Sequence, residues 1–161
     1  MFKHILVAVD GSTYSDGAIP TAIQVAKKFG SDILVVHVHE HDRGRNVVYS
    51  YESPADATRL VGNAVKIIRE AGINAESKLL DMAPGHVAKA IVETAGANRI
   101  DLIVMGSRGL SDIAGLLLGS VTHKVIQLAT VPVLVDRASA IRETSAEPEA
   151  KRVLTPATAT V

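Results

Sequence analysis

Residues 5–12 read ILVAVDGS, an uninterrupted apolar run followed at once by an acidic turn. A short apolar run of this kind is typical of a strand that is buried on both faces of a sheet. Asp10 and Gly11 end the run, and Ser12 is a suitable N-cap for a helix, because its hydroxyl can accept a hydrogen bond from a first-turn N–H. The segment therefore predicts a strand that leads into a helix.

The same alternation of strand and helix continues along the chain. Further strands are expected at residues 32–40, 73–81, 100–106 and 131–135, and helices after Ser12, from Pro54, from Pro84 and at residues 119–129. Parallel strands joined by helices require right-handed crossovers and place helices on both faces of the sheet. The pattern predicts an α/β fold, a doubly wound five-stranded parallel sheet in a three-layer α/β/α sandwich of the Rossmann-like type.

Three details of this pattern are less regular. Pro20 falls inside the first helix, so we expect that helix to start late or to kink. Residues 41–53 are polar and are expected to form a loop. Pro132 lacks an N–H donor, which predicts that the last strand lies at an edge of the sheet.

Composition restricts the classes of protein that the chain can belong to. Its 161 residues correspond to one domain, expected at residues 1–136, and a flexible tail at residues 137–161. Lys plus Arg (17) balance Asp plus Glu (17), and only three Tyr and two Phe are aromatic, which argues against nucleic-acid binding. The absence of cysteine excludes disulfides and thiolate metal sites. No apolar run approaches the roughly 20 residues that span a bilayer, so we expect no membrane contact and a cytoplasmic location.

The most informative segment is residues 105–123, MGSRGLSDIAGLLLGSVTH. It follows the fourth predicted strand, and its glycines let main-chain N–H groups approach an anion without an intervening Cβ. Gly119 and Ser120 open the last helix, whose first turn adds N–H groups and the positive end of the helix dipole. The segment indicates a phosphate site, although it is neither a P-loop nor GxGxxG. The alternative is that Gly106 and Gly109 only form a turn and that Ser120 only caps a helix.

The spacing G-x-x-G-x9-G-S, from Gly106 to Ser120, resembles the ATP-binding subgroup of the universal stress protein family. The resemblance runs from KHILVAVDGS at residues 3–12, through LVVHV at 34–38, to VPVLV at 131–135. It implies a fold similar to the adenine nucleotide α-hydrolases and an adenine nucleotide (ATP, or else AMP or ADP) bound where the strand order reverses. It also implies a nucleotide-dependent role in stress response or signalling, and a homodimer, which we expect to form through the edge strand Val131 to Val135.

The resemblance further implies where the nucleotide binds. Carried over residue by residue, the positions are Ala8, Val9 and Asp10 beside the ribose and adenine, Val38 at the adenine edge, Met105 and Gly106 at the ribose, and Gly109, Gly119, Ser120, Val121 and Thr122 at the phosphates. Arg108 is the only Lys or Arg within the motif. A triphosphate would therefore be held by main-chain N–H groups, Arg108, Lys124 and a Mg or Mn ion.

Catalysis is the main alternative function. Asp10 is the one acidic residue expected near the ligand, and a carboxylate that binds ribose is not available to activate water, so no catalytic residue is assigned. A slow ATPase, or a protein that phosphorylates itself on Ser120 or Thr122, stays an open alternative. A phosphorelay receiver is disfavoured because Asp10 has no acidic neighbour, although Asp81 follows the third strand, and a flavoprotein relative is disfavoured by the few aromatic side chains.

Histidines give a second pattern. His37, His39 and His41 alternate and would share one face of a strand, a spacing that can ligate a metal. We favour polar side chains at a strand end that reach the crevice or the surface, because no nearby carboxylate cluster completes a site. His123, just past the phosphate residues, is expected on the surface of the last helix.

Overall fold

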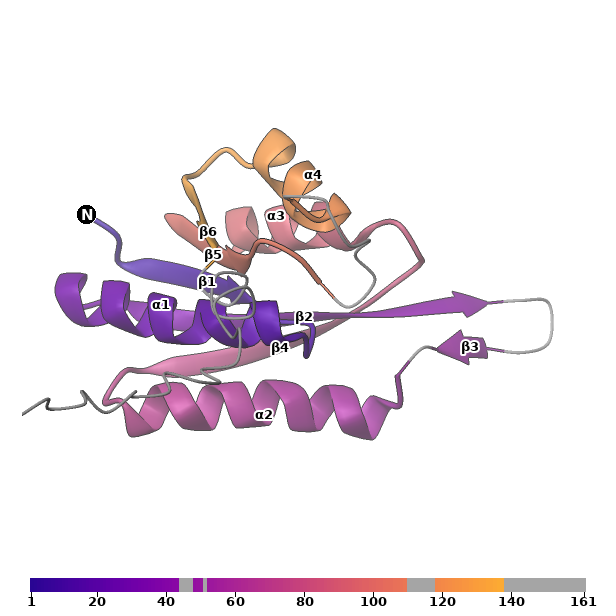
Figure 1. Cartoon of the computed structure of the whole chain (residues 1–161), viewed down its shortest axis with the longest axis horizontal. Coiled ribbons are helices and arrows are strands. Elements are labelled where there is room, and N and C mark those ends of the chain that lie inside the picture. Colours follow the sequence, from indigo (N-terminus) through magenta and orange to yellow (C-terminus); the bar gives the residue numbers. More distant parts are fainter. Residues whose placement is uncertain (44–47, 51, 110–117, 138–161) are drawn as a thin grey trace, which may run out of the picture.

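The computed structural model describes residues 1–43, 48–50, 52–109 and 118–137, in which strands and helices alternate (Figure 1). In chain order the elements are β1 (His4–Ala8), α1 (Thr13–Phe29), β2 (Asp32–Arg43), β3 (Val48–Ser50), α2 (Pro54–Glu70), β4 (Ala75–Met82), α3 (Val87–Ala97), β5 (Leu102–Gly106), α4 (Ser120–Leu128) and β6 (Val133–Asp136). Within these residues, no helix combines the length and hydrophobicity that crossing a bilayer requires. The predicted tail lies, apart from Arg137, outside the described residues, so the domain boundary stays a prediction.

Five strands pair in parallel, in the order β4-β2-β1-β5-β6. The chain winds from β1 through β2 to β4, and then crosses to β5 and β6 on the other side of β1. This is the doubly wound Rossmann-like sheet predicted from the sequence, and its strand order reverses between β1 and β5. β6 lies at one edge, as the missing N–H of Pro132 predicts.

Helices cover both faces of this sheet (Figure 1): α1 and α2 lie on one face, and α3 and α4 lie on the other. Side chains of the central strand β1 alternate between the two layers. Ile5 and Val7 are fully buried on the side of α1 and α2, whereas Leu6 and Ala8 are buried on the side of α3 and α4. Full burial of a large apolar side chain contributes about 1.5–3 kcal/mol. Burial on both faces fixes β1 at the centre, so Asp10 lies in the middle of the carboxyl edge.

Two helix starts differ from the prediction. The hydroxyl of Ser12 accepts a hydrogen bond from the N–H of Ser15 at 3.2 Å, so α1 begins at Thr13 and contains Pro20; the expected late start is wrong. The helix expected from Pro84 begins only at Val87. The reason is Gly85, whose φ of 83° cannot continue a helix.

The predicted loop at residues 41–53 is wrong for residues 41–43 and 48–50, which are strand, whereas residues 44–47 and 51 lie outside the described part of the chain. β2 continues to Arg43, and β3 pairs with it in antiparallel fashion, with His41 opposite Ser50. A two-stranded antiparallel ribbon can form from a segment that is mostly polar, so its composition is like that of a loop.

Candidate functional site

A cavity of about 680 Å³ opens at the carboxyl ends of β1, β2 and β5, where the strand order reverses. Open parallel sheets bind ligands at this point, and small-molecule sites usually enclose about 300–1,000 Å³. The structure brings all the predicted site residues to its lining: Ala8, Val9, Asp10, Val38, Met105, Gly106, Arg108, Gly109, Gly119, Ser120, Val121 and Thr122. That these residues bind a nucleotide stays a prediction.

The bend after β5 and the first turn of α4 form one wall of this cavity, which we call the main-chain wall. The N–H of Gly119 donates a hydrogen bond to the carbonyl oxygen of Ser107 at 2.8 Å, and the N–H of Ser107 donates to the carbonyl oxygen of Asp136, also at 2.8 Å. The first bond holds the two glycine segments side by side, and the second ties the bend to the end of β6; residues 110–117 lie outside the described part of the chain.

The start of α4 gives this wall its electrostatic character. Gly119 is the N-cap and has no side chain to accept the first-turn N–H groups. Ser120 and Val121 line the cavity, and N–H groups at these positions have no acceptor within the helix. Together with the positive end of the helix dipole, they favour an anion at this end of the cavity.

The hydroxyl of Thr122 has a different role from the one expected. It is buried and donates a hydrogen bond to the carbonyl oxygen of Gly106 at 2.9 Å. Its proton is therefore used inside the fold, where it ties α4 to the end of β5. Ser120, by contrast, is an exposed residue of the first turn that lines the cavity.

Asp10 combines a turn role with a place in the cavity. Its Oδ1 accepts hydrogen bonds from the N–H of Ser12 at 3.0 Å and from the hydroxyl of Ser12 at 2.6 Å. Its Oδ2 lies so close to Gly109 that a Cβ at Gly109 would come within 2.5 Å of it. A side chain at position 109 would therefore displace this carboxylate or the loop after β5.

β2 runs farther than its neighbour β1. The last residue of β2 that pairs with β1 is Val36, whose carbonyl oxygen also accepts a hydrogen bond from the N–H of Val9 at 3.0 Å. Main-chain groups of alternate residues point to the same side of a strand. The N–H and carbonyl of Val38 therefore face the cavity, on the side where β1 has ended.

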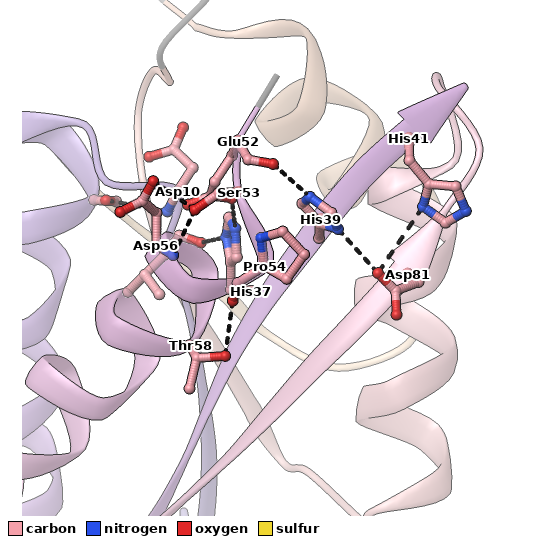
Figure 2. A network of polar contacts seen from close by, with 12 residues as sticks. Asp10, His37, His39, His41, Glu52, Ser53, Pro54, Asp56, Thr58 and Asp81 are labelled. Atoms are coloured by element: carbon pink, nitrogen blue, oxygen red, sulfur yellow. Dashed lines mark hydrogen bonds and ion pairs between the residues drawn. The ribbon is translucent and has the colours of Figure 1, made fainter. Parts of the chain in front are cut away.

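The other wall of the cavity, which we call the side-chain wall, contains residues that the motif did not reveal. His37 is buried, with Nδ1 2.8 Å from the carbonyl oxygen of Val9 and Nε2 2.6 Å from Oε2 of Glu52 (Figure 2). Glu52 directly precedes the N-cap of α2. This contact therefore ties the entry into α2 to the centre of the sheet.

His39 lines the same wall and is the register partner of Asp81 on β4. Its Nδ1 lies 2.9 Å from Oδ1 of Asp81 and its Nε2 lies 3.0 Å from the carbonyl oxygen of Glu52 (Figure 2). The hydrogen bond with Asp81, followed by that with the carbonyl of Glu52, raises the pKa of His39 above 6.5, because both oxygens favour the protonated ring. The carboxylates of Glu52 and Asp81 thus lie beside His37 and His39, a pairing that the sequence did not predict.

The basic residues of the motif region differ in whether they line the cavity. Arg108 lines it, whereas Lys124 is exposed on α4 and does not belong to the lining. His123 is exposed, as expected for a residue on the helix surface, and its Nε2 lies 3.3 Å from Nε2 of Gln127. Among the described residues of the lining, Arg108 is therefore the one arginine or lysine.

Comparison of the sequence with known families and proteins gives a consistent result. The model of the universal stress protein family matches residues 1–137. The universal stress protein YxiE of Bacillus subtilis is 34% identical over 151 residues, covering 85% of this chain and 100% of the relative. A universal stress protein of Thermus aquaticus, from the QAH/OAS sulfhydrylase 3′ region, is 38% identical over 141 residues, with coverages of 85% and 100%.

Solved structures share the fold as well. The universal stress protein from Archaeoglobus fulgidus in complex with dAMP gives a TM-score of 0.61 at 26% identity and covers 84% of this chain and 97% of its own. A universal stress protein in complex with cAMP gives a TM-score of 0.64 at 26% identity, with coverages of 84% and 97%. The ligands of these two similar proteins are both adenine nucleotides.

Proposed function

This chain belongs to the universal stress protein family, and from that premise we propose that its cavity binds an adenine nucleotide, ATP or else AMP or ADP. Nucleotide binding would make the protein a nucleotide-dependent module of stress response or signalling. The main-chain wall supports this proposal most strongly, because the hydrogen bond from Gly119 to Ser107 joins two segments rich in N–H donors at one cavity. The dAMP and cAMP found in similar proteins agree in chemistry with such a cavity.

The proposed nucleotide lies with its phosphates on the main-chain wall and its base toward β2. The phosphates contact Gly109 and Gly119 and the first turn of α4, where N–H groups and the helix dipole favour negative charge. The ribose lies between Asp10 and Met105, and its hydroxyls donate to the carboxylate. Ala8 and Val9 end the strand beneath the base. In this proposal residues 1–136 form the binding domain and residues 137–161 a flexible tail.

A triphosphate needs more positive charge than a monophosphate. Arg108 is the basic side chain in the lining, so the remaining charge of ATP would be balanced by Mg or Mn, which bind phosphate oxygens and keep several waters. AMP requires no such ion. The ratio of the two affinities with and without divalent ion therefore reports how the site handles phosphate charge.

Isothermal titration of the full chain with Mg-ATP and with AMP, at millimolar ligand, tests the proposal. One site per chain is expected, and the double variant Gly119→Val, Ser120→Ala should abolish it, because it removes the close approach and the hydroxyl at the phosphates. Mass spectrometry of any nucleotide that co-purifies then identifies the physiological ligand. A parent chain that is folded by circular dichroism but gives no heat with either nucleotide would contradict the proposal.

A slow ATPase or a self-phosphorylating protein is the second candidate. One observation supports it: the hydroxyl of Ser120 is exposed at the phosphate end of the cavity, whereas that of Thr122 is engaged with Gly106. Radiolabelled γ-phosphate distinguishes the candidates. Label on the parent protein that is lost in Ser120→Ala, or phosphate release above buffer, favours catalysis, and the absence of both favours a binding module.

We also propose a homodimer formed through the edge strand, residues Val131 to Val135. β6 is an edge of the described sheet, and an edge presents N–H and carbonyl groups that a two-fold mate can pair with. Light scattering should give the dimer mass. A monomer mass at high concentration would contradict this assembly.

A further inference from the structure

Three side chains with metal-ligating atoms meet where β2 and β4 run beyond the rest of the sheet. His39 and His41 are two residues apart on β2, and Asp81 is the register partner of His39 on β4. Figure 2 shows both imidazole rings directed toward the Asp81 carboxylate. Their ring centroids lie 6.0 Å apart, so the rings flank one space. A ligating atom of each residue lies within 4.8 Å of those of the other two.

The separations of these atoms suit a single ion. Oδ1 of Asp81 lies 2.9 Å from Nδ1 of His39 and 3.9 Å from Nδ1 of His41. Two ligands that each lie about 2.1 Å from one ion are roughly 3 to 3.5 Å apart in tetrahedral or octahedral geometry. The observed distances lie on either side of that range, so small side-chain rotations bring all three atoms to bonding distance.

The surroundings of the cluster suit a ligand site as well. The side chain of His39 is only 8% exposed and is held through Nε2 by the carbonyl oxygen of Glu52 at 3.0 Å. A backbone carbonyl on the second ring nitrogen is the outer contact that orients metal-bound histidines. The side chain of Asp81 is 65% exposed, so an ion can enter from solvent and keep water on its remaining positions.

We propose that His39, His41 and Asp81 bind a divalent transition metal ion, with Zn²⁺ as the representative, through His39 Nδ1, His41 Nδ1 and Asp81 Oδ1. Two imidazoles and one carboxylate favour Zn²⁺, Co²⁺, Ni²⁺ and Cu²⁺, whereas Mg²⁺ and Ca²⁺ prefer sets of oxygen ligands. The site thus differs in chemistry and position from the ion proposed at the phosphates. It goes beyond nucleotide binding and does not depend on it.

Co²⁺ titration of the untagged full chain, in the absence of nucleotide, tests this site. We expect one Co²⁺ per chain with the visible absorption of a low-coordinate complex, and displacement of that signal by one equivalent of Zn²⁺. His41→Ala and Asp81→Asn should each weaken Co²⁺ binding at least about 100-fold, because each removes a direct ligand, and loss of an outer partner alone already costs 10- to 100-fold.

His4→Ala is the matched control, because His4 is an exposed histidine at the opposite end of the sheet, and it should bind as the parent does. Zn²⁺ should also raise the melting temperature of the parent and of His4→Ala, but not that of Asp81→Asn, whose exposed side chain can be changed without loss of the fold. Equal affinity in the parent and in both ligand variants would overturn the proposal. So would a parent chain that takes up no Co²⁺, since the cluster would then be a hydrogen-bonded strand end only.

Discussion

The two walls of the cavity differ in the chemical groups that they present and in how their residues are distributed along the sequence. The main-chain wall, between Gly106 and the start of α4, presents N–H groups and needs glycine where chains approach closely. The side-chain wall, formed by His37 and His39 of β2 and by Glu52, presents imidazoles and a carboxylate. The residues of the first wall fall within 15 consecutive positions, 106–120. The second wall joins His37 to Glu52, 15 residues away, and its His39 is held by Asp81, which lies 42 residues away and outside the cavity lining.

This difference separates two kinds of prediction. A wall of N–H groups is visible in a sequence because glycine spacing and a helix start mark it locally. A wall of side chains becomes visible only when strand pairing is known, because a shift of one residue in the register would turn Asp81 away from His39. Substitutions on each wall should therefore act on different properties.

The largest effect is expected from Gly109→Val on the main-chain wall. A Cβ at this position would lie 2.5 Å from Oδ2 of Asp10, so the carboxylate or the loop must move. Isothermal titration should show a loss of nucleotide affinity of at least about 100-fold, or roughly 2.7 kcal/mol. Gly96→Ala is the control: a Cβ there meets no atom within 4 Å, and the change should stabilise α3 by about 0.5–1 kcal/mol without altering affinity. Unchanged affinity in Gly109→Val would remove this wall from the proposed site.

Thr122→Val should act on stability more than on binding. It leaves the buried carbonyl of Gly106 without its 2.9 Å donor, which costs about 1–3 kcal/mol. Urea denaturation measures this loss, and Thr122→Ser, which keeps the hydroxyl, should recover most of it. If Thr122→Val were as stable as the parent but failed to bind nucleotide, the hydroxyl would belong to the phosphate site instead.

The substitution His39→Gln, on the side-chain wall, tests how His39 makes the free energy of unfolding depend on pH. Because the pKa of His39 is raised in the folded state, the fold binds this proton more tightly than the unfolded chain does. The resulting stability is fully present below about pH 6.5 and is lost as the pH rises through the folded-state pKa. The difference in unfolding free energy between parent and His39→Gln, measured without metal, should be about 1 kcal/mol near pH 5.5 and shrink by pH 9. A difference that grows as the pH rises would contradict the conclusion that the folded state stabilises the protonated form of His39.

The smallest effect is expected from Ser120→Ala. Its exposed hydroxyl adds one donor to a wall that consists mainly of N–H groups, so ATP affinity should fall only severalfold, equivalent to about 1 kcal/mol. The melting temperature should not change. A loss as large as that of Gly109→Val would mean that side chains, rather than main chain, dominate phosphate binding.

Much of the fold could be predicted, because local signals agreed with it. Ser12 and Gly30 cap α1 as their residue types indicate, and the buried runs form the five parallel strands. Signals that depend on the rest of the chain were missed. The ribbon of β2 and β3 has the composition of a loop and is defined only by the pairing of its two strands. Gly85, by contrast, is a local signal beside Pro84 that the prediction did not use, and it delays the start of α3.

The same distinction applies to the candidate site. The residues predicted from the glycine motif and from the strand ends all line the cavity. Glu52 was missed because nothing near it in the sequence links it to His37, and the partnership of Asp81 with the histidines depends on the pairing of β2 with β4.

The extension of β2 past β1 has a consequence for base selectivity. Beyond Val36, the strand presents the N–H and the carbonyl of Val38 to the cavity, one donor beside one acceptor. The Watson–Crick edge of adenine offers an amino donor beside a ring nitrogen acceptor, so a base bound under the proposed function can take the place of the missing strand. Guanine carries the opposite arrangement and would set donor against donor and acceptor against acceptor. Under the proposed function, the sheet itself would thus distinguish the two purines without using a side chain, because β1 ends before β2.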